Sequence, residues 1–254
     1  MARQQRDLKL YNFTADEIDD CVGIHAPLRE WGRNLHLAGP AIKNLVVMNP
    51  DPTLFDDGTG SGRSVVDIWV VLPKDYDHQL SNIKRAQAKG DDVWSYNALV
   101  QDSYSPKWLI DFDPINFRIM PGFISQNLGL DGLLYWRVDH WKADPWNEVD
   151  NVGDFGWSRN YPGEGMLVYP GEAVGLPGSV VPSMRLKWLR DGVDDYDYIE
   201  LLKRHGEGEW ADARVGSIAP NWVNWTRDID AVEATRTALA KRLQQRCRMR
   251  GGCE

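Results

Sequence analysis

The chain has 254 residues, of which 43% are hydrophobic and 26% are charged, values close to those of globular proteins. This composition excludes a disordered or collagen-like chain. No run of about 18 apolar residues occurs, so we expect no transmembrane helix. The net charge of −8 argues against nucleic acid as the main partner. The length fits one large domain, such as a barrel of roughly 250 residues, or one domain with an appendage.

The ends of the chain and its cysteines carry little targeting or redox information. The first residues, MARQQRDLKL, lack the apolar segment of a signal peptide, so we expect a cytoplasmic protein or a start internal to a longer gene. Cys21, Cys247 and Cys253 have no regular spacing, which favours free thiols over a disulfide framework. A pair between Cys247 and Cys253 across the Gly-rich tail is the alternative.

The first half of the sequence alternates short apolar runs with helical patterns. Strands are expected over 8–15, 44–48, 65–72, 93–98 and 132–138, and helices over 20–37, 76–89 and 114–128. Strands that alternate with helices predict parallel βαβ units, and continuously apolar strands are typical of a sheet buried on both faces. The run GTGSG at 58–62 lacks the Lys-Ser/Thr of a phosphate-binding loop, so we interpret it as a flexible linker.

The second half begins with a long segment, 139–182, that is rich in Trp, Asn, Gly and Pro. It is too aromatic for disorder, so we expect a functional loop at the end of the fifth strand. Helices are expected over 183–204 and 227–246, the second capped by Thr226. The segment between them, 205–222, is interpreted as a surface connection.

Two adjacent carboxylates, Asp16 and Glu17, directly follow the first expected strand. Ligands of parallel α/β folds bind beyond the carboxyl ends of the strands. Repulsion between like charges raises one pKa, which leaves a protonated acid beside an ionised partner and suits general acid/base chemistry. The alternative is that one of the two carboxylates caps the helix that follows.

Other strand ends supply polar and aromatic groups that a barrel would bring to one mouth. These residues are Asn49, Lys74, Asp75, Tyr96, Asn97, Arg137, Asp139, His140 and Trp141. The five histidines lack metal-site spacing, so no metal and no cofactor are expected. Of the twelve tryptophans, we expect a minority to offer flat faces to sugar rings.

Six motifs occur in a fixed order along the chain. They are Asp16-Glu17, VDIWV at 66–70, WSY at 94–96, GLLYWRVDHWKADPWN at 132–147, YPG at 169–171 and SMRLKWLRDGVDDYDY at 183–198. Over about residues 8–204, this order resembles the bacterial domain-of-unknown-function group that includes the glycoside hydrolase family 123 catalytic domain. Two positions depart from the family pattern: Asp139 replaces an Asn, and 162–165 read PGEG.

The resemblance implies an α/β fold of the TIM-type (β/α) barrel class. The barrel would be partial, with about five parallel strands that correspond to strands 4–8 of the family. Residues 1–205 would form the barrel and 206–254 a helical extension. The helix residues Arg185, Arg190, Asp191 and Asp195 would tie the expected 183–204 helix to the barrel.

The resemblance also implies a β-N-acetylgalactosaminidase-like enzyme with a substrate-assisted retaining mechanism. Glu17 would be the general acid and base, and Asp16 would hold the acetamido N–H of the substrate. The expected substrate contacts are Asn49, Trp94, Tyr96, Trp136, Asp139, Trp141 and Trp146.

The sequence leaves open two alternative functions and the question of which partner completes the barrel. The chain is alternatively a non-catalytic carbohydrate-binding remnant, or a glycosidase that pairs Glu17 with a distant carboxylate such as Asp139. The expected partner is a carbohydrate, without nucleic acid or membrane. An open barrel leaves exposed parallel edges, so we expect a truncated gene or fragment that is completed by self-association or by another chain.

Overall fold

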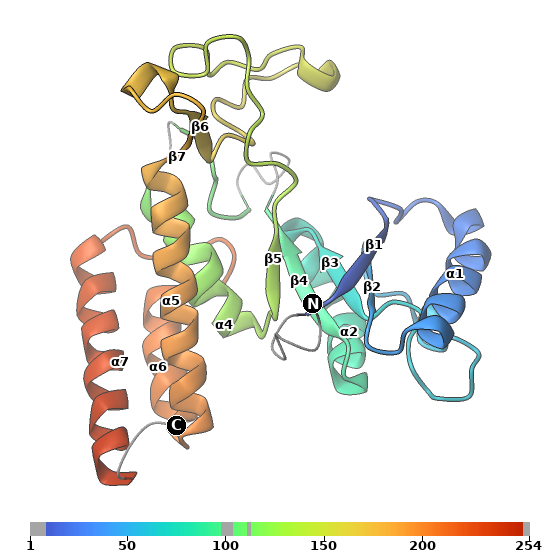
Figure 1. Cartoon of the computed structure of the whole chain (residues 1–254). Helices are drawn as coiled ribbons and strands as arrows, with labels where there is room; N and C mark the ends of the chain where they lie inside the picture. Colours follow the sequence, from blue (N-terminus) through green and yellow to red (C-terminus); the bar gives the residue numbers. More distant parts are fainter. Residues whose placement is uncertain (1–8, 98–103, 111–112, 251–254) are drawn as a thin grey trace. The chain divides into compact units, whose positions relative to one another are not determined.

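The computed structural model describes residues 9–97, 104–110 and 113–250, shown as coloured ribbon in Figure 1. The chain divides into two compact units. The N-terminal unit comprises the residues up to 96 together with 130–134. The C-terminal unit comprises 97–129 and the residues from 135 onward.

The N-terminal unit is built on five parallel strands in the spatial order β1-β2-β3-β4-β5 (Figure 1). The strands are β1 (Tyr11–Ala15), β2 (Lys43–Val47), β3 (Ile68–Val71), β4 (Asp92–Tyr96) and β5 (Gly132–Leu134). They are connected in part by η1 (Val22–Ile24), α1 (His25–Ala38), η2 (Pro52–Leu54) and α2 (Pro73–Lys89). The predicted partial parallel barrel is therefore confirmed. Leu8 and Ala98, at two of the predicted strand ends, lie outside the described residues.

The strands β2 and β3 are largely buried, and apolar residues make up all of β3 and the last three residues of β2. In β2, Leu45 and Val46 are fully buried, and every residue of β3 is buried. Trp69 of β3 satisfies its indole N–H by donating to Asp91 Oδ2 at 3.0 Å. Strands covered on both faces are typical of parallel sheets with helices on either side.

A buried charged network docks α1 and the Gly-rich loop onto the sheet. His36 of α1 is hydrogen-bonded to Asp57 through Nδ1 and to Asp67 through Nε2, both at 2.9 Å. The Arg63 Nε donates to the other oxygen of Asp67 at 2.6 Å. The backbone N–H of Asp57 donates to the Arg63 carbonyl and closes the loop. The segment 58–62 is therefore a loop closed at its base between Asp57 and Arg63.

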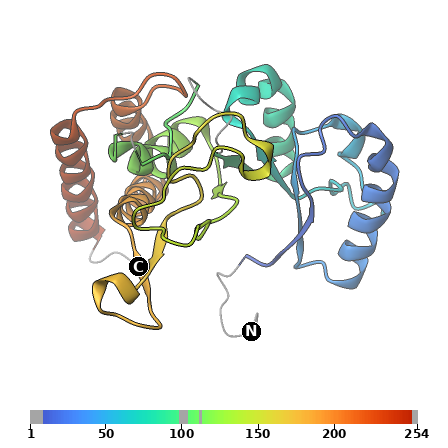
Figure 2. The same cartoon turned by 90° about the horizontal axis from the view of Figure 1, so that it is seen from above.

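The C-terminal unit is helical. Its helices are α3 (Ile115–Ile119), the π-helical turn η4 (Met120–Ile124), α4 (Ser125–Leu128), α5 (Met184–Arg204), α6 (Gly208–Ile218) and α7 (Ile229–Arg250). Figures 1 and 2 show α5, α6 and α7 side by side. At Gly192 of α5, an added Cβ would lie 2.4 Å from the Arg118 carbonyl oxygen, so glycine permits close packing of α5 on α3 and η4.

Two sequence predictions in this unit are wrong. The expected surface connection 205–222 contains α6, which buries Ala211, Val215 and Ile218 on one face. The expected cap Thr226 is replaced by Asp228, whose carboxylate accepts the backbone N–H groups of residues 230 and 231. Helix α7 therefore begins two residues later than predicted, because Asp228 satisfies the free N–H groups of its first turn.

The long segment before α5 forms an ordered loop with a small hairpin. The strands β6 (Val168–Pro170) and β7 (Val180–Pro182) pair antiparallel, and the 3-10 turns are η5 (Asp154–Gly156) and η6 (Glu172–Val174). Arg185 anchors this loop to the start of α5, because its guanidinium donates to the Gly163 carbonyl at 3.3 Å and to the Tyr169 hydroxyl at 2.6 Å.

Two further observations concern membrane-spanning helices and the cysteines. No described helix combines the length and apolar character needed to cross a membrane. Cys21 is a free, exposed thiol, as expected. Cys247 is disulfide-bonded, which corrects the expectation of a free thiol at this position. Cys253 lies outside the described residues.

Candidate active site

The adjacent pair Asp16 and Glu17 lies directly beyond the C-terminal end of β1. The register between β1 and β2 shifts between Phe13 and Ala15, which marks a β-bulge or a similar irregularity. Glu17 then adopts a left-handed backbone conformation with φ 50°. The turn returns Ile18 to the core, where it is 6% exposed, and leaves both carboxyl side chains at the surface. Bulges and strained backbone recur next to active sites.

The surroundings of the pair favour the protonated forms. Partial burial raises the pKa of Asp16 above its ordinary value. The pKa of Glu17 is also raised, first by partial burial and then by the negative charges of Asp16 and Asp19. The positive charge of Lys74 acts in the opposite direction. A glutamate that keeps its proton to higher pH is suited to act as a general acid.

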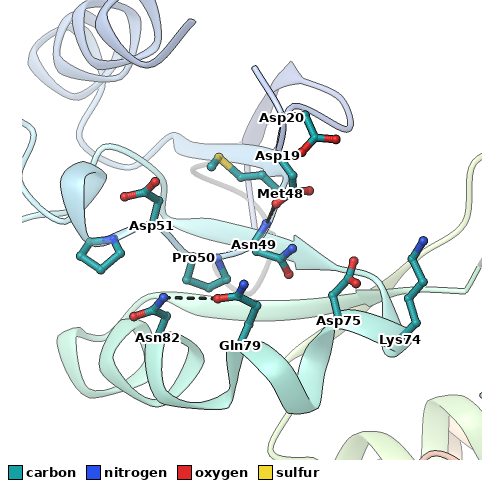
Figure 3. Close-up of a pocket in the computed structure, with 11 residues that line it drawn as sticks. Asp19, Asp20, Met48, Asn49, Pro50, Asp51, Lys74, Asp75, Gln79 and Asn82 are labelled. Atoms are coloured by element: carbon teal, nitrogen blue, oxygen red, sulfur yellow. Dashed lines mark hydrogen bonds between the residues drawn. The ribbon is translucent and has the colours of Figure 1, made fainter. Parts of the chain in front are cut away.

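A polar hollow of about 540 Å³ opens beside this strand edge (Figure 3). It is lined by segments that follow β1, β2 and β3: Asp19, Asp20, Met48, Asn49, Pro50, Asp51, Pro52, Lys74, Asp75, Gln79 and Asn82. The Asn49 backbone N–H donates to Asp19 Oδ1 at 2.7 Å. The Asn49 side-chain Oδ1 is buried and has no hydrogen-bond partner among the described residues. Such an acceptor suits a ligand hydroxyl, since buried polar atoms are normally satisfied.

The two predicted contacts on β4 lie deeper in the same unit. Tyr96, the last residue of β4, is 7% exposed. The Trp94 indole lies over Gly132 of β5, where an added Cβ would come within 2.6 Å of the ring. The Trp94 Nε1 is buried without a partner among the described residues. Trp94 therefore packs over the neighbouring strand, and its substrate contact stays a prediction.

The three predicted tryptophan platforms of the C-terminal unit use their indole N–H groups inside the protein. Trp136 donates to Glu164 Oε1 at 2.9 Å. Trp141 donates to the Val168 carbonyl at 2.8 Å, and Trp146 donates to the Pro170 carbonyl at 3.1 Å. These tryptophans can therefore offer a ligand their ring faces but not their donors.

Asp139 lies at the base of the long loop and is paired. Its carboxylate accepts from Arg137 Nε at 2.9 Å, and both side chains are about half exposed. Its backbone forms an isolated antiparallel bridge with Met166. Asp139 is accordingly a surface residue of the C-terminal unit, whereas Asp16 and Glu17 belong to the N-terminal unit.

Sequence reasoning missed Glu164 as a titrating group. This side chain is 2% exposed, and burial raises its pKa to about 7 even though Trp136 and Tyr135 hydrogen-bond to it and Arg185 is nearby. The sequence signal for this residue was the departure of the PGEG segment from the family pattern.

Sequence reasoning also passed over Phe155 and Trp157, whose rings contact Trp136. Within the described ranges, no group of three or more potential ligands is placed to hold a metal ion.

These features define the class of the protein, a parallel α/β barrel-type domain with adjacent carboxylates at the carboxyl edge of its sheet. Residues 53–202 match the family described as glycoside hydrolase 123, catalytic domain. Because these residues are more than half of the chain, the chain belongs to that family. The membership confirms the resemblance to the glycoside hydrolase 123 catalytic domain. The matched segment begins after Asp16 and Glu17.

Comparison with solved structures supports the fold. The chain is similar to a family 123 glycoside hydrolase from Clostridium perfringens that was analysed for glycolipid glycan hydrolysis, with a TM-score of 0.64 and 15% identity. The alignment covers 94% of this chain and 41% of that enzyme, so this chain spans less than half of the enzyme's length. At this identity, the likeness establishes the fold. No curated protein matches the chain.

Proposed function

We propose that the chain hydrolyses a β-linked 2-acetamido sugar of the N-acetylgalactosamine type by substrate-assisted catalysis. The observation that carries the proposal is the Asp16–Glu17 pair at the carboxyl end of β1, with the pKa of both groups raised. Family membership, the polar hollow lined by the nearby Asp19 and Asp20, and the unsatisfied Asn49 oxygen support it.

In the proposed first step, the acetamido carbonyl oxygen of the substrate attacks the anomeric carbon and the bond to the leaving oxygen breaks. Glu17 gives its proton to that oxygen, so the leaving group departs as a neutral alcohol. Asp16 holds the acetamido N–H and stabilises the positive charge of the oxazolinium intermediate. Glu17, now ionised, takes a proton from water as the water attacks the anomeric carbon and reopens the ring. The product retains the configuration of the substrate, and no enzyme nucleophile is required.

A panel of aryl glycosides tests this proposal. We expect the chain to hydrolyse the aryl β-N-acetylgalactosaminide. We expect no hydrolysis of the aryl β-galactoside, because that sugar lacks the acetamido nucleophile. Hydrolysis of both sugars would instead favour a pair of distant carboxylates, such as Glu17 with Asp139. Binding of N-acetylgalactosamine without turnover of any glycoside would favour the carbohydrate-binding remnant.

We also propose that a second copy of the chain covers the outer edge of β1. Within the described residues, β1 ends the sheet, and its Tyr11 and Phe13 are about half exposed. An apolar hollow of about 290 Å³ runs beside this strand, with Trp31 of α1 on its other side. Unpaired strand edges can pair with another chain.

Light scattering tests this association. The expected result is twice the 28.9 kDa monomer mass for the native sequence and the monomer mass for Phe13→Lys, which places a charge on the edge. A native chain that is monomeric at micromolar concentration would contradict the proposal.

A further inference from the structure

Phe155, on the long loop of the C-terminal unit, has both a strained backbone conformation and an exposed side chain. Among the described residues, Glu17 and Phe155 are the two non-glycine residues with positive φ, at 50° each. Phe155 is also 71% exposed, the highest value among the described aromatic residues. Its neighbours Gly153 and Gly156 adopt the same left-handed region without strain. A phenylalanine that is strained and unburied is not explained by folding, and such outliers gather at functional sites.

Three other rings hold the Phe155 side chain in place. The ring centroid of Phe155 lies 5.4 Å from His140, with the planes 30° apart. It lies 5.6 Å from Trp157 and 5.9 Å from Trp136. We refer to Trp136, His140, Phe155 and Trp157 as the aromatic cluster. Phe155 is its outermost ring, since the other three are half-buried.

Hydrogen bonds fix two of the supporting rings. Trp136 is held by Glu164, which is itself buried. His140 Nε2 is hydrogen-bonded to Asp154 Oδ2 at 3.0 Å, and Asp154 directly precedes Phe155 in the turn. The aromatic cluster is therefore a preorganised platform, and an exposed ring fixed in advance loses little entropy when a ligand stacks on it.

We propose that the turn 153–156 is a sugar-binding subsite in which the apolar face of a pyranose ring stacks on Phe155. This inference deepens the proposed function, on which it rests, by naming a substrate-recognition site in the C-terminal unit. The negative face of an aromatic ring attracts the C–H groups of a sugar face. The hydroxyls around a sugar ring require both donors and acceptors. Beside Phe155, Asp154 supplies acceptors, and Lys142, whose Nζ lies 3.7 Å from Asp154 Oδ1, supplies a donor.

Calorimetric titration of the full chain tests the subsite. The probe is the disaccharide in which N-acetylgalactosamine is β-linked to galactose, and every protein carries Glu17→Gln so that the probe stays intact. Phe155→Gly should weaken binding by about tenfold, because the stacking ring is lost. Phe155→Trp, which keeps an aromatic face, should bind within about twofold of the parent. The matched control is Val152→Gly, which removes another exposed apolar side chain of the same loop and should leave the Kd unchanged.

Thermal unfolding separates a binding role from a packing role. The unfolding temperature of Phe155→Gly should equal or exceed that of its parent, because glycine adopts φ 50° without strain. A lower unfolding temperature with an unchanged Kd would overturn the inference. Binding of the chain to phosphatidylcholine vesicles that carry no sugar, lost in Phe155→Gly, would also overturn it in favour of a lipid-contacting residue.

The two proposals fail in distinguishable ways. If the native chain does not turn over aryl glycosides but the disaccharide Kd depends on Phe155, the proposed function is wrong and the subsite stands. If turnover is found and the Kd is the same with and without Phe155, the subsite is wrong and the proposed function stands.

Discussion

Tyr11 of β1 and Trp94 of β4 meet edge to face, with ring centroids 5.6 Å apart and planes at 82°, although two strands separate β1 from β4 in the sheet. Near the same strand ends, Lys9 Nζ lies 2.7 Å from Asp92 Oδ2. In a flat sheet, strands three positions apart are separated by about 14 Å. The five strands therefore curl strongly, and Trp94 fills the concave side that this curling produces.

A double-mutant cycle checks this contact in solution. Tyr11→Leu and Trp94→Phe should each destabilise the protein, and their effects should be coupled by about 1 kcal/mol, because aromatic edge-to-face pairs contribute this much beyond buried area. Chemical unfolding of the native chain, both single variants and the double variant gives the coupling energy. Effects that simply add would mean that β1 and β4 do not approach each other in solution.

The charges around Glu17 predict opposite shifts in the pH profile of hydrolysis. The alkaline limb of kcat/KM reports the loss of the Glu17 proton in the free enzyme. Removing the positive charge with Lys74→Met should raise the pKa of Glu17 and move this limb to higher pH. Removing a negative charge with Asp19→Asn should lower that pKa and move the limb to lower pH.

Each of these displacements should shrink in 1 M salt, because the groups are near solvent. Shifts in the same direction for the two variants would contradict the assignment of the alkaline limb to Glu17.

Burial of Glu164 predicts a loss of stability with rising pH. Its pKa is raised from 4.5 to about 7 in the folded state, so folding favours the protonated form. The stabilising contribution is complete below pH 4.5 and is lost as the pH rises through about 7. Glu164→Gln stays neutral and should gain stability relative to the native chain over this interval, up to roughly 3 kcal/mol at pH 8.

Urea unfolding at pH 4.5, 6 and 8 measures this effect. The matched control is the same substitution at an exposed position, Glu30→Gln on the surface of α1. A constant difference between Glu164→Gln and the native chain at all three pH values would refute the prediction.

The buried ion pair between Arg118 and Asp195 predicts a large stability difference within one helix. Arg118 Nε donates to Asp195 Oδ2 at 2.6 Å, and both side chains are almost fully buried. Asp195→Ala should cost about 3–5 kcal/mol because it removes the buried partner of the Arg118 guanidinium and leaves only the more exposed Glu233 to pair with it. Asp191→Ala, which breaks an exposed pair with Arg190 on the same helix, should cost less than about 1 kcal/mol. Equal losses in thermal unfolding would contradict this difference.

Strong hydrophobic patterns made the core of the fold predictable from sequence. The five strands and α2 were predictable because continuous apolar runs and a C-terminal glycine mark them; Gly90 caps α2 with φ 90°. Helix α6 was missed because glycines and charged residues dilute its three buried positions. Arg185 and Asp195 bind the long loop and α3 within the C-terminal unit, so their expected tie to the barrel stays a prediction, whereas Arg190 and Asp191 pair with each other at the surface.

The candidate site was predictable only where residues adjoin in sequence. Asp16 and Glu17 are neighbours at a strand end, so their proximity needs no knowledge of the fold. The internal bonds of the Trp136, Trp141 and Trp146 indoles join residues 24 to 28 positions apart, which no local pattern reveals. The strain at Phe155 is a property of the backbone. In the sequence, the nearby glycines at 153 and 156 were the one local indication of it.

The central claim is that Glu17 is the acid and base for hydrolysis of a 2-acetamido sugar. The most direct measurement is kcat of Glu17→Gln on an N-acetylgalactosaminide whose leaving group is a poorly acidic alcohol, beside the native chain and the control Glu30→Gln. The account predicts a loss of about 10²- to 10⁴-fold for Glu17→Gln, since a leaving group of this kind requires protonation, and native activity for the control. Native turnover by Glu17→Gln would contradict the account.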